Sequence, residues 1–125
     1  MLFRSNVAVR DNLIHDNDKA GLVFGGYASG TGRVSDCTFT HNTLWHDDAL
    51  GQGYGEVWVQ WGSANTIAHN VIVARPGGVL LSNGEGDLGT ALDWNLWHAD
   101  GSPSWTWHGD AVGSLAAFQI GRAHV

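Results

Sequence analysis

Apolar residues recur at fixed positions around four asparagines of this chain. In every copy an apolar residue lies three positions before the Asn and another lies two positions after it. The asparagines are Asn12, Asn42, Asn70 and Asn95, so successive copies are 30, 28 and 25 residues apart. Repetition at such a period is typical of solenoid proteins, in which each unit packs only against its neighbours. The pattern therefore predicts a stack of similar units.

Within each unit the short apolar runs have the two-residue alternation of β-strands. Val7 and Val9, for example, alternate with Ala8 and Arg10. The chain has 18 Gly among its 125 residues, and they lie mostly between these runs, as expected for many tight turns. We therefore predict an all-β fold, a parallel β-helix of about four rungs at roughly residues 5–34, 35–63, 64–89 and 90–109.

Alignment on the asparagines gives four columns that are apolar in every unit. We expect their side chains to face inward and to stack about 4.8 Å apart. The columns are Val9, Phe39, Ile67 and Leu92; Ile14, Leu44, Ile72 and Trp97; Leu22, Val57, Val79 and Trp105; Phe24, Val59, Leu81 and Trp107. Cys37 aligns with Val7 in a further inward column, so we interpret it as a small buried residue and not as a nucleophile.

The asparagine column itself predicts a buried ladder. A buried Asn can bond the backbone and pass an amide hydrogen bond to the Asn of the next rung, which satisfies polar groups that water cannot reach. The alternative is that Asn12, Asn42, Asn70 and Asn95 line a polar ligand site, and we favour it much less.

These rungs resemble the right-handed parallel β-helix proteins of the pectate-lyase-like superfamily. The resemblance rests on residues 41–44 and 55–60, on Asp93-Trp94-Asn95-Leu96-Trp97, and on residues 107–109 and 114–119; overall it covers about residues 5–119. It implies a right-handed coil in a secreted or surface-attached protein that meets polysaccharide. It does not specify the chemistry, because such folds serve as lyases, hydrolases, epimerases and non-catalytic surface proteins.

The end of the sequence departs from this pattern. Ser114 is a suitable N-cap for a helix over residues 114–119. Residues 120–125, Ile-Gly-Arg-Ala-His-Val, are a translation of a common sequencing-adapter stretch. Our hypothesis is that residues 1–119 are a β-helix fragment and that residues 120–125 are a non-native tail; a natural tail is the less favoured alternative.

Charge and composition exclude some function classes. The formal charge is −6 and the six basic residues are scattered, so no cluster exists that would neutralise the phosphates of a nucleic acid. No apolar run is long enough for a transmembrane segment. The first four residues are too short to be a signal peptide, so secretion is an expectation from the resemblance alone.

Acidic and histidine side chains follow the asparagines in three of the four units. They are His15, Asp16 and Asp18; His46, Asp47 and Asp48; and His98 and Asp100. We expect them to gather along one edge of the coil, where they could bind Ca²⁺ or act in acid–base chemistry. Their offsets from the Asn differ between units, and the third unit has Val73-Ala74-Arg75 instead. We therefore assign no metal ligands, leave any cofactor undetermined and favour solvated turn residues.

The second candidate site is an outward row in residues 56–61. If Val57 and Val59 face the core, alternation places Glu56, Trp58 and Gln60 outside. An exposed Trp with polar neighbours is typical of sugar-stacking surfaces. In our alignment Val23 and Leu80 share the column of Trp58, so packing of Trp58 under residues 26–32 or 46–55 is the slightly favoured alternative.

Catalytic residues cannot be assigned from the sequence. Elimination at a uronate needs a base and a cation that neutralises the carboxylate, but Lys19, Arg33 and Arg75 lie in no recognisable motif. His41 and His69 share the column before the Asn with Asp11 and Trp94, which we interpret as a solvent-facing position. The first hypothesis is thus a fragment of a secreted lyase-like or hydrolase-like protein that acts on or binds polysaccharide. The alternative is a non-catalytic surface or adhesive β-solenoid that binds glycan; an epimerase is a weaker third.

Overall fold

A computed structural model describes residues 2–25, 32–83, 89–107 and 109–116. The described chain is built from β-strands, and its helical residues are Leu115 and Ala116. The strands are β1 Leu2–Ser5, β2 Ala8–Arg10, β3 Leu13–His15, β4 Leu22–Phe24, β5 Gly32–Ser35, β6 Thr38–Thr40, β7 Thr43–Trp45, β8 Val57–Val59, β9 Gly62–Ser63, β10 Thr66–Ala68, β11 Val71–Val73, β12 Val79–Asn83, β13 Ala91–Asp93, β14 Leu96–His98, β15 Ser104–Trp107 and β16 Asp110–Val112.

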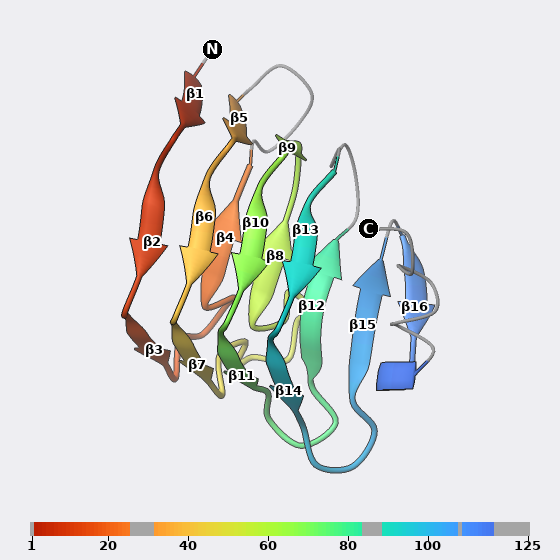
Figure 1. Ribbon diagram of the computed structural model, residues 1–125. Coiled ribbons are helices and arrows are strands. Elements are labelled where there is room, and N and C mark those ends of the chain that lie inside the picture. The colour runs from red at the N-terminus through yellow and green to blue at the C-terminus, as the bar shows by residue number, and fades with distance from the viewer. Residues whose placement is uncertain (1, 26–31, 84–88, 108, 117–125) are drawn as a thin grey trace.

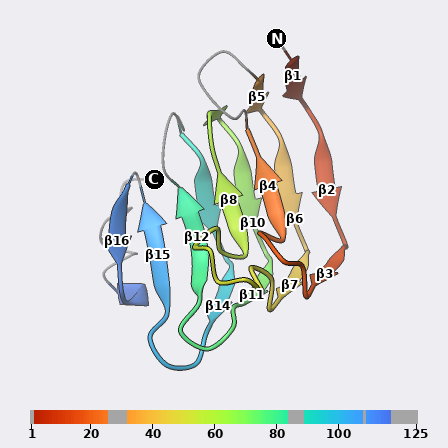
Figure 2. The same cartoon turned by 180° about the vertical axis from the view of Figure 1, so that it is seen from behind.

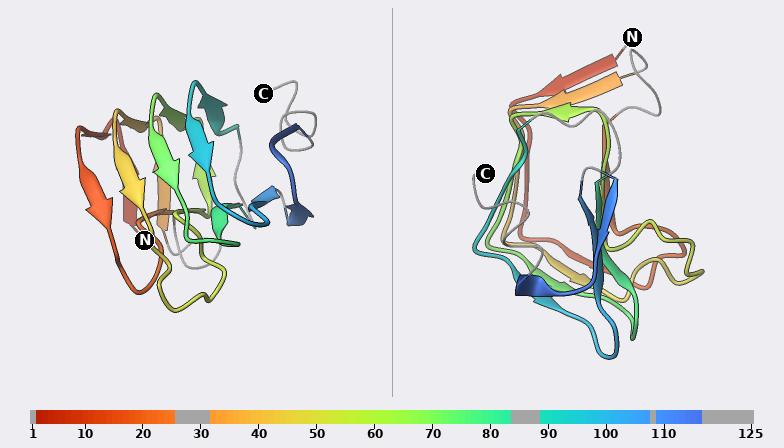
Figure 3. Two further views of the ribbon diagram at one scale, coloured as in Figure 1. Left: turned by 90° about the horizontal axis from the view of Figure 1, so that it is seen from below. Right: turned by 90° about the vertical axis from the view of Figure 1, so that its right-hand side faces the viewer.

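The strands stack into four sheets that form the sides of a coil (Figures 1 and 3). Sheet A contains β1, β5 and β9. Sheet B contains β2, β6, β10 and β13; sheet C contains β3, β7, β11 and β14; sheet D contains β4, β8, β12 and β15, with β16 added antiparallel at its end. All other described pairings are parallel, and sheet D faces the viewer in Figure 2. The chain is thus a parallel β-solenoid of about three full turns plus a pass through β13, β14 and β15, which confirms the predicted fold.

The corner between sheets B and C has the same backbone conformation in each turn. The residue before each ladder asparagine has a positive φ: 60° at Asp11, 57° at His41, 58° at His69 and 55° at Trp94. A single left-handed residue redirects the chain sharply, so each strand ends after three residues and the next begins on a new side.

The asparagine ladder occupies this corner as predicted. The Oδ1 atoms of Asn42, Asn70 and Asn95 each accept two hydrogen bonds from the Asn of the preceding turn, one from its backbone N–H and one from its Nδ2, at 2.9–3.1 Å. The second Nδ2 hydrogen of Asn42, Asn70 and Asn95 is donated to a backbone carbonyl of the preceding turn. Asn42 and Asn70 are 1% and 3% exposed. Their polar atoms are bonded to one another and to the backbone, so they do not line a ligand site.

The apolar columns form one continuous core. Buried members include Phe39, Leu44, Ile67, Ile72 and Leu92, and Cys37 is buried with them as expected. The rings of Phe24 and Phe39 stack with centroids 4.5 Å apart. At the other end of the core Trp97 meets Trp105 edge-on at 6.2 Å.

One part of our alignment is wrong. In sheet D, Val57 pairs with Leu81 and Trp58 pairs with Ser82. The alignment of Val57 with Val79, and likewise of Val59 with Leu81, is two residues too early on β12. The register of β12 shifts between Val79 and Leu81, and this irregularity is invisible to an alignment that has no gap. Leu80 is consequently fully buried and does not belong to the outward column of Trp58.

Two further expectations concern the ends of the chain. A helical turn begins at Leu115, directly after the predicted cap Ser114. The rest of the expected helix and residues 120–125 lie outside the described residues.

Residues 26–31 also lie outside the described residues, so the alternative in which Trp58 packs under them stays a prediction. No helix among the described residues is long and apolar enough to cross a membrane.

Candidate functional site

The insertion between β7 and β8 is the largest departure from the repeat. It projects outward from the coil as the yellow loop in the right-hand view of Figure 3. Three backbone N–H groups fasten it to the shorter turn one rung earlier: Asp48 donates to the Lys19 carbonyl, Ala49 to Asn17 and Leu50 to Asp18, at 2.6, 3.0 and 3.1 Å. The insertion is therefore held in place by the turn below it.

Asp48 organises the loop from within. Its carboxylate accepts hydrogen bonds from the backbone N–H groups of Gln52, Gly53 and Gly55, at 3.0, 3.0 and 3.1 Å. Gly53 and Gly55 have φ of 85° and 79°, a conformation that glycine adopts without strain. The side chain is 8% exposed and replaces the backbone partners that a loop of this length lacks.

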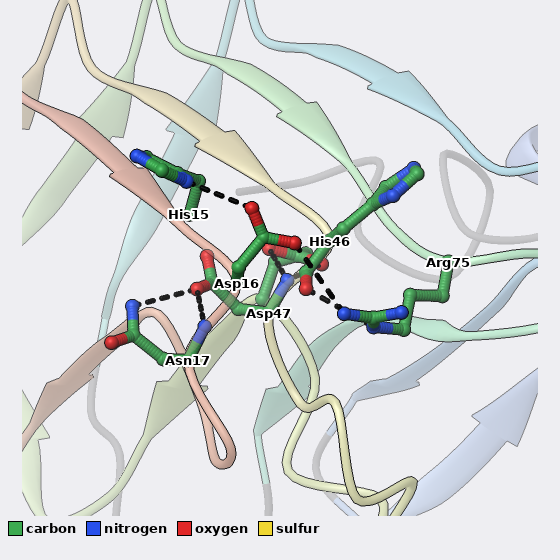
Figure 4. Close-up of polar contacts among 7 residues, drawn as sticks. His15, Asp16, Asn17, His46, Asp47 and Arg75 are labelled. Atoms are coloured by element: carbon green, nitrogen blue, oxygen red, sulfur yellow. Dashed lines mark hydrogen bonds and ion pairs between the residues drawn. The ribbon is translucent and has the colours of Figure 1, made fainter.

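Beneath the loop lies a buried pair of carboxyl groups, Asp47 and Glu56, which are 2% and 0% exposed. The Asp47 N–H donates to both Glu56 carboxyl oxygens, at 2.9 and 3.1 Å. Oδ1 of Asp47 accepts from the backbone N–H and the Nδ2 of Asn17, at 3.0 and 2.7 Å (Figure 4). The pair thus ties the second turn of the coil to the first.

This pair requires a proton. Oδ2 of Asp47 is buried and accepts no hydrogen bond from any N–H or O–H group of the described residues. Burial, together with the hydrogen bond to the Asp47 side chain, raises the pKa of Glu56 from 4.5 to about 9. Glu56 is therefore neutral at pH 7, so only one of the two buried carboxyl groups carries a charge.

Arg75 lies above the pair, in the turn between β11 and β12. Its Nε donates to the His46 carbonyl at 3.1 Å, and its Nη2 is 3.5 Å from Asp16 (Figure 4). The hydrogen bond from His15 is the main cause that lowers the pKa of Asp16. Because the Arg75 side chain is 40% exposed and its remaining donors have no partner among the described residues, it can contact a ligand.

A cavity of about 250 Å³ opens between the insertion and this turn. Residues 47–49, Gly51 and Gly53 line one side, and residues 74–79 line the other. We call this space the Arg75 cleft. The carboxylate oxygens of Asp48 are already bonded to the loop, and Asp47 is buried with its Oδ1 bonded to Asn17. The guanidinium of Arg75 is therefore the charged group at the cleft with donors left for a ligand.

The predicted outward row is only partly correct. Glu56 is completely buried, which contradicts its expected outward position: the chain is still turning into β8 at this residue, so strand alternation does not apply. Trp58 does face outward but is half-buried, and the ring of Tyr54 from the insertion lies against it with centroids 4.4 Å apart. Gln60 is half-buried one residue beyond β8. A sugar-binding role for Trp58 and Gln60 stays a prediction.

The acidic and histidine residues gather only in part. His15, Asp16, His46 and Asp47 do lie together around Asn17 and Arg75, whereas His98 pairs with its own neighbour Asp100 at 3.2 Å. Across the described residues, no three His, Cys, Asp or Glu side chains are placed to hold a metal ion. Sequence reasoning missed the contact of Asn17 with Asp47. The signal that could have found it is the offset of 30 residues between them, which equals the first ladder spacing.

Comparison with known proteins yields one relative. The chain is 23% identical over 121 residues to the protein YwoF of Bacillus subtilis (strain 168), which is described as uncharacterized. The match covers 94% of this chain but 26% of that protein, so the chain spans about a quarter of the relative's length. No protein-family model and no solved structure matches the chain.

Proposed function

We propose that this chain is part of a carbohydrate-active β-solenoid, secreted or displayed at the cell surface, that binds or acts on a polysaccharide at the Arg75 cleft. The observation that carries the proposal is the cleft itself, a recess on the side of the coil with one arginine that has donors left beyond its bonds to His46 and Asp16. At about 250 Å³ it lies just below the range of about 300–1,000 Å³ typical of small-molecule pockets, and it suits a single sugar unit of a longer chain.

A catalytic role would make Arg75 the group that neutralises a sugar carboxylate during elimination, and would need a nearby base. A hydrolase would instead need two carboxyl groups facing the bond to be cleaved. The buried acids fit neither need, because Asp48 is committed to the loop and Asp47 to Asn17. This commitment favours the second candidate, a non-catalytic surface or adhesive solenoid that binds glycan through the same cleft.

The test is to mix the protein with polygalacturonate, alginate, xylan and cellulose. Rising ultraviolet absorbance would reveal the unsaturated products of a lyase, released reducing ends would reveal a hydrolase, and NMR of the recovered polymer would reveal an epimerase. Retention of the protein on an immobilised polymer without any product would establish binding alone.

Arg75→Ala should abolish the observed activity or retention and leave the melting temperature within a few degrees of the parent. Arg33→Ala, which changes a β5 residue outside the cleft, is the matched control. Equal retention by Arg75→Ala and Arg33→Ala would exclude the cleft as the binding site. A parent protein that neither binds nor alters any of the four polymers would refute the proposal.

A further inference from the structure

The outer surface of sheet C, in the lower part of Figure 1, differs from the rest of the coil in its residues. The middle residue of each strand, such as Leu44 in β7, faces the core, so the first and third residues face outward. The two outward columns are Leu13, Thr43, Val71 and Leu96, and His15, Trp45, Val73 and His98. None of these outward positions of the described strands holds Asp, Glu, Lys or Arg. We call this surface the sheet C face.

Four large apolar side chains of the sheet C face are open to solvent. Leu13 is 68% exposed, Leu96 56%, Trp45 45% and Val71 40%. A sheet with one solvated side normally carries polar residues there, as β6 of sheet B does with its two threonines. Contiguous exposed apolar residues with a polar rim mark sites of interaction with other molecules. The sheet C face therefore indicates a docking surface.

The backbone of sheet C restricts the kind of partner. Thr43, Val71 and Leu96 donate their N–H groups to the asparagine carbonyls of the preceding turn, at 2.8, 2.9 and 2.9 Å. An extended peptide that adds itself as a strand needs a free sheet edge, and these groups are already used within the sheet. An α-helix bonds its own backbone internally and contacts a surface through side chains alone. The bonding of the face thus favours a helix over a strand.

The dimensions of the sheet C face also match a helix. From Leu13 to Leu96 the face spans three strand spacings, about 14 Å, which corresponds to roughly two and a half helical turns. Each strand is three residues long, which gives a width of about 10 Å, close to the diameter of about 10–12 Å of a helix with its side chains. Thr43 is shorter than Leu13 on one side of it and leaves space for a side chain of the helix. A helix that lies along the coil axis would cover the face.

The charges at the ends of the strands select a basic partner. Asp93 and Asp100 flank β14, and neither has an Arg or Lys partner among the described residues; Asp100 contacts His98 at 3.2 Å. Asp11 and Asp16, which flank β3, each have an arginine beside them. A second copy of this chain, with its formal charge of −6, would bring acidic rims together, and an anionic membrane would be repelled too. Lys or Arg beside the apolar stripe of a helix would instead meet the unpaired acids.

We propose that the sheet C face docks an amphipathic helix of another protein, which lies along the coil axis. The apolar stripe of this helix covers Leu13, Val71 and Leu96. Its Lys or Arg residues beside the stripe meet Asp93 and Asp100. Apolar burial supplies most of the affinity, and the acids select the partner by charge. The inference does not depend on the proposed function, because no residue of the sheet C face lines the Arg75 cleft.

The experiment is isothermal titration calorimetry of the intact protein with a synthetic helical peptide that has Leu along one face and Lys on both sides of that face. A variant that combines Leu13→Ser with Leu96→Ser should bind this Lys peptide about tenfold more weakly, because two apolar side chains leave the contact. Both residues are exposed, so the melting temperature should not change. Val23→Ser, which removes a 49% exposed apolar side chain from sheet D, is the matched control and should bind as the parent does.

The charge requirement is tested with a second peptide that has Glu in place of every Lys. The parent should bind the Lys peptide more tightly than the Glu peptide. A variant that combines Asp93→Asn with Asp100→Asn should reduce this preference by about threefold at low salt, as expected for exposed ion pairs. Equal binding of the two peptides by the parent would overturn the basic partner.

Three further results would overturn the docking of a helix. The first is failure of the parent to bind the Lys peptide, and the second is parent-like binding by the variant with both leucines replaced. The third is a dimer of the parent in sedimentation velocity, or its cosedimentation with phosphatidylcholine vesicles, that is lost in the same variant. A dimer would assign the face to a second copy, and cosedimentation would assign it to a lipid surface.

Discussion

The asparagine ladder and the Asp47–Glu56 pair both bury polar groups between stacked turns, but by different chemistry. In the ladder a neutral amide both donates and accepts, so each Asn satisfies its neighbour and the arrangement can repeat in every turn. The acid pair consists of two groups that can only accept when ionised, and burial keeps one of them, Glu56, protonated at pH 7. The stability that the ladder contributes should therefore not change with pH, whereas the stability that the acid pair contributes should.

The first prediction concerns breaking the ladder in its middle. Asn42→Ala removes the acceptor of two Asn12 donors and the donors to Asn70 Oδ1 and the Val9 carbonyl. Leaving these groups unpaired in a buried position should lower the free energy of unfolding by about 1–3 kcal/mol, measured by urea denaturation. Asn12→Ala, at the exposed end of the ladder, is the control and should cost less. Equal losses for the two variants would contradict the ladder as a source of stability.

The ladder also shows which parts of the structure the sequence could predict. Stacked turns repeat the same contacts, so a column of similar residues such as Phe39, Ile67 and Leu92 indicates both burial and neighbours. The prediction failed where a turn has an irregularity of its own, as at the shift between Val79 and Leu81. Such a shift follows from local packing and leaves no trace in the repeat.

The candidate site was less predictable for the same reason. It depends on an insertion found in one turn, and periodicity contains no information about a feature that occurs once. Glu56 was expected outside because alternation was extended past the start of β8, where the chain still bends inward. His15, Asp16 and Asp47 were correctly expected near one edge, but their bonding to Asn17 and Arg75 depends on side-chain geometry that spacing does not fix.

The second prediction concerns the acid pair and pH. The pKa of Glu56 rises from 4.5 to about 9 on folding, so between these values the folded protein binds a proton that the unfolded chain has lost. The free energy of unfolding should therefore fall as pH rises through this window, by at most about 1.4 kcal/mol per pH unit. Glu56→Gln keeps a donor for Asp47 at every pH and should remove this contribution.

The comparison to make is the difference in unfolding free energy between the parent and Glu56→Gln at several pH values from 5 to 9. The other titrating groups are common to both proteins and cancel in the difference. A difference that grows in favour of Glu56→Gln as pH rises would establish the shared proton, whereas a constant difference would show that Glu56 is ionised in the folded state. The ladder supplies a control, because the cost of Asn42→Ala should not vary over this range.

The smallest effect should come from a substitution that changes only the backbone preference of a corner residue and leaves the asparagine side chains as they are. Ala64 precedes the buried Asn65 at the corner between sheets A and B, has a φ of 54° and is exposed. It has no side-chain group that could favour the left-handed conformation. Ala64→Gly should raise the free energy of unfolding by about 0.5–1 kcal/mol, because relief of the left-handed strain outweighs the entropy lost with glycine.

The matched control for Ala64→Gly is Ala8→Gly, an exposed position in β2 with ordinary strand geometry, where glycine should destabilise by about 0.5–1 kcal/mol. Opposite signs for the two variants in urea denaturation would show that the left-handed residue is itself a source of strain at each corner. Losses at both positions would instead mean that the stacked turns hold Ala64 without strain.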